Sequence, residues 1–167
     1  MLEIILAVLV LGLDQLTKWL AATRLITAYP IIPGVFELDY VQNRGAAWGL
    51  LQGGRVFFIV ITVIICAALI YLMIKERKRM QLLSRIALTL ITAGAIGNLI
   101  DRAILGYVRD MLSFVLINFP VFNVADSSLV IGAILLIIDV FFTKNSAFDV
   151  IEKSIKERKE KKSGKPE

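Results

Sequence analysis

Four long apolar runs constrain the fold of this chain more than any other feature of its sequence. They cover about residues 2–22, 56–74, 83–105 and 124–142. Each is close to the length of about 20 residues that carries a helix across the hydrocarbon core of a bilayer. Because backbone amides cannot stay unpaired in lipid, runs of this length predict helices that cross a membrane.

The composition agrees with a membrane protein. Hydrophobic residues make up 57% of the 167 residues, above the share of about 45–50% in soluble domains. The formal net charge of +5 does not indicate nucleic-acid binding, because the basic residues gather in two short segments beside the apolar runs. The chain has no histidine and a single cysteine, Cys66, so it lacks the usual ligands of a zinc site. We expect neither a metal nor another cofactor.

The first apolar run has the position of a signal peptide but not its pattern. A signal peptide has a basic start and an uninterrupted apolar centre. Here no basic stretch precedes the run, and Asp14, Gln15 and Lys18 interrupt it. We therefore expect residues 2–22 to be a retained transmembrane helix.

Basic residues predict which way the chain crosses the membrane, since lysine and arginine in short loops mark the cytoplasmic side. The connection between the second and third runs is basic, and so is the tail after the fourth run. Their basic residues are Lys75, Arg77, Lys78, Arg79 and Arg85, and Lys144, Lys153, Lys156, Arg158, Lys159, Lys161, Lys162 and Lys165. We expect both termini to be cytoplasmic, and residues 23–55 and 106–123 to lie on the outer side.

The outer segments carry strand patterns. Residues 35–42 alternate Phe36, Leu38 and Tyr40 with polar residues, and this period of two predicts a strand with one buried face. Residues 114–122 are rich in β-branched and aromatic residues, which indicates either a second extended stretch or a loop along the membrane surface.

The predicted fold is therefore an all-α membrane protein of four transmembrane helices with a small extracytoplasmic β-containing segment. Residues 1–147 would form the transmembrane domain, including the outer segment 23–55. Residues 148–167 mix glutamate with lysine and would form a basic cytoplasmic tail, a short solvated helix that frays.

Polar residues inside the first run lie on one helical face. Asp14 and Lys18 are four residues apart, a spacing at which side chains on a helix meet. They predict either an ion pair that orients the helix or one wall of a polar cavity.

The third run contains a second polar face. Asn98, Asp101 and Arg102 share it by spacing, and Gly94 and Gly97 would let another helix approach closely. This pattern fits an interhelical hydrogen-bond network, and a network that holds catalytic groups would have the same pattern.

Asp110 and Asp126 lie at the edges of apolar segments, where an ionised carboxylate is expensive. Asp110 would sit just outside the third span and Asp126 at the start of the fourth, so the two can meet. Asp126 could instead be an ordinary carboxylate at a helix N-terminus, and Asp110 a partner of Arg109 or Arg102. If they meet, one carboxylate can take a proton from water while the other, protonated, polarises a peptide carbonyl.

One further cluster, NRGAAWG at residues 43–49, precedes the second run. Asn43 and Arg44 offer side-chain donors, Gly45 and Gly49 permit tight backbone geometry, and Trp48 suits a membrane interface. The cluster predicts either a turn that re-enters the interface or a loop that contacts substrate.

Taken in order, these clusters resemble the bacterial lipoprotein signal peptidase (signal peptidase II) family. The resemblance rests on DQLTK at residues 14–18, NRGAAWG at 43–49, GNLIDR at 97–102 with GYVRD at 106–110, and FNVADSS at 122–128. Each motif alone is weak, but four in this order on a chain with four spans are highly specific.

The resemblance implies a membrane-embedded aspartic endopeptidase of the bacterial inner membrane, with its active site on the outer side. Such enzymes remove signal peptides from prolipoproteins by cleaving before the diacylglyceryl-modified cysteine, and globomycin blocks them. The catalytic pair would be Asp110 and Asp126. Residues that shape the site or contact substrate would be Asp14, Lys18, Asn43, Gly45, Asn98, Asp101, Arg102 and Asn123.

The chain departs from the family pattern beside the first catalytic position. The family usually reads Val-Val-Asp-Phe, whereas this chain has Arg109 before Asp110 and Met111 after it. A nearby guanidinium would favour the ionised carboxylate. Because adjacent residues of a strand point to opposite faces, Arg109 could instead reach lipid headgroups. Trp48 replaces a usual phenylalanine, which is a mild change.

Two other function classes fit parts of the sequence. A serine–lysine protease would combine Lys18 with Ser113, Ser127 or Ser128. A small proton-coupled transporter would use the acidic residues of the membrane region, which are Asp14, Asp101, Asp110 and Asp126. An evident inverted repeat, common in transporters, is missing from the sequence.

Overall fold

The structure is a computed structural model that describes residues 1–45, 54–117 and 119–163, with side chains described up to residue 160. Its elements in chain order are α1 (Leu2–Arg24), β1 (Tyr29–Ile32), β2 (Phe36–Asn43), α2 (Arg55–Glu76), α3 (Leu82–Ile104), β3 (Val108–Phe114), α4 (Val124–Phe142) and α5 (Ala147–Ser163). The helices α1 to α4 are each long and apolar enough to cross a membrane. The four predicted spans are confirmed, with ends that agree to within about two residues.

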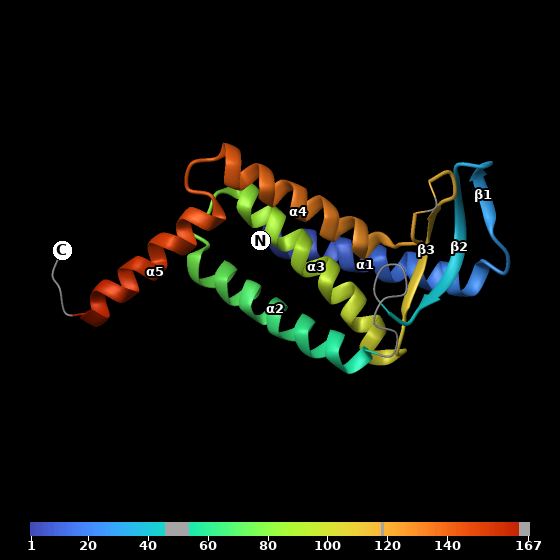
Figure 1. Ribbon diagram of the computed structural model, residues 1–167, viewed down its shortest axis with the longest axis horizontal. Helices are drawn as coiled ribbons and strands as arrows, with labels where there is room; N and C mark the ends of the chain where they lie inside the picture. Colours follow the sequence, from blue (N-terminus) through green and yellow to red (C-terminus); the bar gives the residue numbers. More distant parts are fainter. Residues whose placement is uncertain (46–53, 118, 164–167) are drawn as a thin grey trace.

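Helix α3 is the centre of the bundle, because α1, α2 and α4 all pack against it. Many of its residues are buried, whereas large apolar side chains of the outer helices, such as Ile4, Ile64 and Ile134, are exposed. An exposed apolar helix surface is what a protein in lipid presents. The strands lie at one end of the bundle and α5 projects from the other (Figure 1).

Two glycines of α3 allow the close packing that their spacing predicts. A Cβ atom on Gly97 would lie 2.7 Å from Asp14 Oδ2, and one on Gly94 would overlap the carbonyl oxygen of Ala125. Helices α1 and α4 therefore approach the α3 backbone directly, which brings polar side chains of all three helices together.

The three strands form an antiparallel sheet in the order β1-β2-β3. The predicted strand at residues 35–42 is confirmed as β2. The second extended stretch begins earlier than predicted, since β3 is Val108–Phe114, while residues 115–117 form a turn. Phe122 rejoins this edge through an isolated bridge to Leu112. The strand was not predicted at these residues because Arg109 and Asp110 interrupt its apolar pattern. Both side chains form hydrogen bonds in the folded protein.

The tail is helical, as predicted. Helix α5 begins at Ala147, and Ser146 before it exchanges hydrogen bonds with Asp149. Its first turn is anchored to the bundle, because Ala147 and Val150 pack with Met80 and Leu88.

Candidate active site

Asp110 lies on β3, opposite Val41 of β2, and is almost fully buried. Its two carboxylate oxygens have different partners. Asn43 Nδ2 donates to Oδ2 at 3.0 Å, and Asn123 Nδ2 donates to Oδ1 at 2.6 Å. Two amide donors from separate segments thus fix the orientation of the carboxylate.

Asp126 lies in the first turn of α4 and takes part in a capping box with Asn123. The Asp126 backbone N–H donates to Asn123 Oδ1 at 2.9 Å, and the Asn123 N–H donates to Asp126 Oδ2 at 3.2 Å. The reading of Asp126 as a helix N-terminal carboxylate is therefore confirmed. Its other oxygen, Oδ1, accepts a hydrogen bond of 2.7 Å from Asn98 Nδ2.

The side chain of Asn123 joins the two aspartates. Its amide nitrogen donates to Asp110 while its amide oxygen accepts from the Asp126 backbone. The same nitrogen also donates to Asn98 Oδ1 at 3.1 Å, and that oxygen accepts from Lys18 Nζ at 2.9 Å. Because Asn98 Oδ1 is occupied in this way, its nitrogen is left to face Asp126. Both aspartates are thus held by one connected set of amides.

The surroundings of Asp110 disfavour its ionised form. Burial, and next the charge of Asp126, raise the pKa of Asp110 to about 6 from the ordinary value of 3.8, although hydrogen bonds from Asn43 and Asn123 oppose the rise. A carboxyl group with this pKa and an anionic neighbour can hold a proton close to neutral pH, as paired carboxylates in acid–base catalysis do.

A buried group of four charges lies beside the aspartates. Lys18 Nζ is 2.9 Å from Asp14 Oδ2 and 3.8 Å from Asp101 Oδ2, and all three side chains are fully buried. The predicted ion pair within α1 is confirmed, and it does border the polar interior. Arg109 completes the group, so two cations balance two anions.

Arg109 turns away from Asp110 and clamps Asp101. Its Nη2 lies 2.7 Å from Asp101 Oδ1, its Nε lies 3.0 Å from Oδ2, and its backbone N–H also donates to Oδ2. Nη2 donates to Gln15 Oε1 as well, at 2.9 Å. The prediction that Arg109 and Asp110 point to opposite faces is confirmed. The suggested partner, a lipid headgroup, is wrong: the partner is Asp101, and this bond raises the pKa of Arg109 further.

Arg102 and Gly45 border another side of the site. The Arg102 guanidinium lies 4.9 Å from the Phe58 ring centre and donates to the Gly45 carbonyl at 3.3 Å. Gly45 N–H in turn donates to Asn43 Oδ1 at 3.0 Å, which fixes the amide that faces Asp110. The rest of the predicted cluster, residues 46–49 with Trp48, lies outside the described residues.

A cavity of about 510 Å³ opens beside the two aspartates. Its polar side is formed by Asn43, Asn98, Arg102, Asp110, Asp126 and Ser127. Its apolar side comes from the end of β3, the β3–α4 connection and α4, chiefly Phe114, Phe119, Phe122, Val130 and Ile131. The Phe114 and Phe122 rings stack at 5.7 Å. Reactive carboxylates therefore face a space whose walls suit an apolar ligand.

All the predicted site residues belong to one connected region. Asp110, Asp126, Asn98, Asn123 and Asn43 form its hydrogen-bonded centre, Arg102 and Gly45 border it, and Asp14, Lys18 and Asp101 support it. In the described part of the chain, histidine, cysteine, aspartate and glutamate form no group of three that could hold a metal.

Sequence reasoning missed two polar residues. Gln15 interrupts the first apolar run but was not among the predicted site residues; its amide contacts Asp14, the Gly97 carbonyl and Arg109 of β3. Asp139, in the fourth run, accepts from Ser84 Oγ at 2.7 Å and from the Ala147 N–H at 2.9 Å. A lone carboxylate in an apolar run was the signal for Asp139; its role is to anchor α5 at the end of the bundle opposite the strands.

The geometry offers no support for a serine–lysine pair. The ammonium group of Lys18 is engaged by Asp14 and Asn98, and the hydroxyls of Ser127 and Ser128 each donate to a backbone carbonyl.

Comparisons with known proteins show the family of the chain. Residues 6–142 match the family model described as signal peptidase (SPase) II. The chain is 52% identical over 138 residues to a lipoprotein signal peptidase of Caldanaerobacter subterraneus subsp. tengcongensis, a match that covers 81% of this chain and 92% of the relative. It is 45% identical over 145 residues to that of Enterococcus faecalis, covering 86% and 89%.

Two solved structures of bacterial membrane enzymes share the fold. One described as a bacterial membrane enzyme, determined by the in meso method at 1.9 Å resolution, superposes with a TM-score of 0.75 at 41% identity, covering 85% of this chain and 94% of the other. A second, at 2.3 Å resolution, gives a TM-score of 0.76 over 85% and 91% of the two chains. The chain therefore belongs to the signal peptidase II family of membrane proteases.

Proposed function

We propose that this membrane protease removes signal peptides from prolipoproteins by cleaving before the diacylglyceryl-modified cysteine, with Asp110 and Asp126 as its catalytic pair. The observation that carries the proposal is the Asn123 amide that joins both carboxylates at the wall of one cavity. Paired carboxylates can hydrolyse a peptide bond without histidine, nucleophilic serine or metal.

The reaction follows from one shared proton. The ionised aspartate takes a proton from water, whose oxygen attacks the peptide carbonyl carbon, while the protonated aspartate donates a hydrogen bond to the carbonyl oxygen. When the C–N bond breaks, the proton passes to the nitrogen of the lipidated cysteine, which leaves as an amine. The donors Asn43, Asn98 and Asn123 hold the two carboxylates in place during these steps.

The supporting residues keep this arrangement from relaxing. Lys18 orients Asn98, and Asp14 accepts a hydrogen bond of 2.9 Å from the Ala125 N–H at the start of α4. Asp101 holds β3 through Arg109. These residues act on catalysis through position, while Arg102 faces the cavity with a positive charge.

The substrate chemistry matches the cavity. Its phenylalanine and aliphatic wall suits the diacylglyceryl chains and the apolar signal peptide, and the same wall would take membrane lipids or a globomycin-type inhibitor. Basic residues around the α2–α3 turn and on α5 favour a cytoplasmic location for that end. On this orientation, the strands and the cavity would lie on the outer side of the bacterial inner membrane. Residues 1–147 would form the peptidase domain and 148–167 a cytoplasmic tail.

Purified protein incubated with a diacylglyceryl-modified prolipoprotein tests this function. The expected result is loss of the signal peptide, inhibition by globomycin, and no cleavage of the same prolipoprotein without its lipid. Equal cleavage of both forms would contradict the proposed substrate. Cleavage that globomycin leaves unchanged would contradict the proposed place of inhibitor binding.

A further inference from the structure

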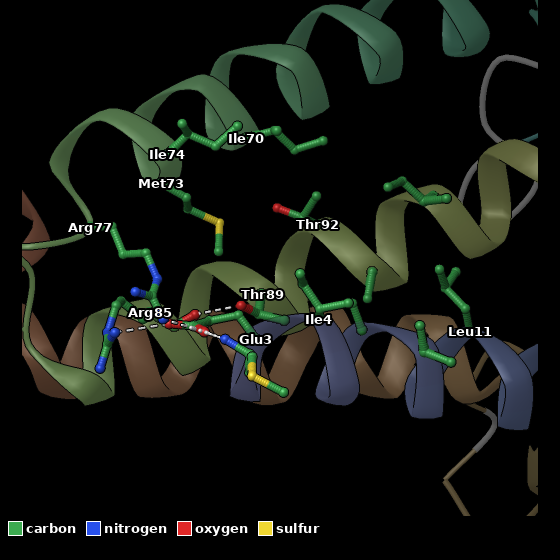
Figure 2. A pocket seen from close by; sticks show the side chains of 15 residues that line it. Glu3, Ile4, Leu11, Ile70, Met73, Ile74, Arg77, Arg85, Thr89 and Thr92 are labelled. Atoms are coloured by element: carbon green, nitrogen blue, oxygen red, sulfur yellow. Dashed lines mark hydrogen bonds and ion pairs between the residues drawn. The ribbon is translucent and has the colours of Figure 1, made fainter.

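A second groove lies in the half of the bundle away from the strands. Helices α1 and α2 each pack on α3, and the space between them is a groove of about 360 Å³ lined by residues from all three helices (Figure 2). None of the residues that line it also lines the cavity beside Asp110 and Asp126. The groove is therefore separate from the proposed active site.

The wall of the groove is apolar along its length. Ile4 and Leu11 of α1 face Ile70 and Ile74 of α2 across it, and Val8 also lines it. Two hydroxyl groups of α3 also line it, but each is already satisfied. Thr89 Oγ1 donates to the Arg85 carbonyl and Thr92 Oγ1 to the Leu88 carbonyl, both at 2.7 Å. A ligand in this groove meets hydrocarbon rather than free polar groups.

A cationic cluster closes one end of the groove. Arg77 Nη2 lies 3.1 Å from Glu3 Oε2, and Arg85 Nη1 lies 2.9 Å from Glu3 Oε1 (Figure 2). One carboxylate thus serves two guanidinium groups and the Met1 ammonium, which lies 3.4 Å from Glu3 Oε2, so the cluster carries a net positive charge. Two buried atoms of this cluster have no hydrogen-bond partner among the described residues: the donor Arg85 Nε and the acceptor Glu3 Oε1, which lies at ion-pair distance from Arg85 Nη1. An anionic ligand with oxygen acceptors would supply what this cluster lacks.

The dimensions of the groove match one leaflet of a membrane. From Glu3 to Leu11 α1 rises about 12 Å, and from Arg85 to Ile96 α3 rises about 16 Å, at about 1.5 Å per residue. Half of a hydrocarbon core of about 30 Å is about 15 Å. The charged end lies near the α2–α3 turn, at the level expected for headgroups of the proposed cytoplasmic side.

We propose that this groove binds one anionic phospholipid of the cytoplasmic leaflet, with an acyl chain between α1 and α2 and the phosphate at Arg77 and Arg85. Basic pockets between membrane helices on the cytoplasmic side are known to favour anionic headgroups. The site depends on the proposed orientation of the chain but not on its peptidase chemistry.

Native mass spectrometry of the full-length protein, loaded with phosphatidylglycerol and phosphatidylcholine of identical acyl chains, tests the site. We expect roughly fivefold greater retention of phosphatidylglycerol, the effect of about one uncompensated basic residue near a membrane surface. The double variant Arg77→Gln/Arg85→Gln should retain both lipids equally. The control Arg79→Gln should keep the preference, because Arg79 pairs with Glu76 and Glu157 and does not line the groove.

A third variant keeps the test decisive if the double variant fails to fold. Glu3→Gln removes the competing carboxylate and leaves both arginines, so it should increase the retention of phosphatidylglycerol. Equal retention of both lipids by the wild type, or reduced retention of phosphatidylglycerol by folded Glu3→Gln, would overturn the proposal. So would a lipid-free dimer, since a second copy of the chain would then fill the groove. Prolipoprotein cleavage is measured separately for each variant. A variant that loses the lipid preference but still cleaves would separate failure of the lipid site from failure of the proposed function.

Discussion

Asp110 titrates in a range where its protonation affects both stability and activity. Its pKa is raised to about 6 by burial and by Asp126, so between about pH 4 and pH 6 the folded protein holds a proton that the unfolded chain has released. This stabilisation is present below pH 4 and is lost as the pH rises through 6. From the size of the pKa difference we expect it to amount to about 3 kcal/mol.

The variant Asp110→Asn tests this linkage, since asparagine does not titrate. Between pH 4 and pH 7 the free energy of unfolding of the wild type in detergent should fall more steeply than that of Asp110→Asn, by about 2.5 kcal/mol. The same pH slope in both proteins would show that Asp110 is not the group responsible.

Arg109 is the chain's departure from the family pattern, and its removal should be costly. Arg109→Val leaves the fully buried Asp101 with Lys18 at 3.8 Å as its remaining cation. Loss of one partner from a buried ion pair costs about 3 kcal/mol of unfolding free energy. Arg109→Lys should lose less, because an ammonium group keeps the charge but not the two-pronged geometry.

Denaturant titration of the three proteins in detergent measures this difference. Arg24→Gln, at the exposed end of α1, is the matched control and should change stability by less than about 0.5 kcal/mol. An Arg109→Val protein as stable as the wild type would mean that the clamp on Asp101 adds nothing.

At the scale of the helices, α3 and α4 are held together by backbone contact at Gly94. A methyl group there would overlap the Ala125 carbonyl and press on Leu129, so Gly94→Ala must move α4 and the Asp126 that it carries. We expect the free energy of unfolding to fall by about 1–3 kcal/mol. The cleavage rate should fall as well.

Gly12→Ala supplies the control, because a Cβ atom at Gly12 meets nothing within 4 Å. Alanine favours the helix over glycine by roughly 1 kcal/mol, so this variant should keep its activity and be no less stable. Thermal unfolding and prolipoprotein cleavage check both proteins. Equal behaviour of the two variants would contradict the role assigned to Gly94.

Elements set by local pattern could be predicted from the sequence. Hydropathy located α1 to α4, and the alternation of Phe36, Leu38 and Tyr40 located β2. Strand β3 was misplaced because Arg109 and Asp110 make its pattern polar. Asp110 is buried and Arg109 half-buried, and the partners that satisfy them come from outside β3. Asp101 of α3 accepts from Arg109, and Asn43 and Asn123 donate to Asp110.

The contacts within the site could not be predicted from the sequence, because they depend on how distant segments pack together. Lys18 and Asn98 are 80 residues apart, and no spacing rule connects them. The Arg109–Asp101 clamp spans eight residues but requires a reversal at Gly106, where φ is +85° and glycine is strongly favoured. The motif resemblance identified the same residues without explaining how they touch.

At the scale of the whole molecule, the sheet and α5 lie at opposite ends of the bundle (Figure 1), so orientation can be measured directly. In a Cys66→Ala background, Ile26→Cys before β1 and Lys144→Cys before α5 place single exposed thiols at the two ends. A membrane-impermeant maleimide should label Ile26→Cys in intact cells. It should label Lys144→Cys only after the cells are lysed. The reverse pattern would invert the proposed orientation.

The claim that Asp110 and Asp126 form the catalytic pair is tested most directly by single variants in one cleavage assay. Wild type, Asp110→Asn, Asp126→Asn, Ser127→Ala and Ser128→Ala are each incubated with diacylglyceryl-modified prolipoprotein, and the products are identified by intact mass. We expect both asparagine variants to fold and to lose cleavage by about a thousandfold, the usual contribution of a general acid or base. Both alanine variants should still cut before the lipidated cysteine. Full processing by either folded asparagine variant would contradict the catalytic assignment.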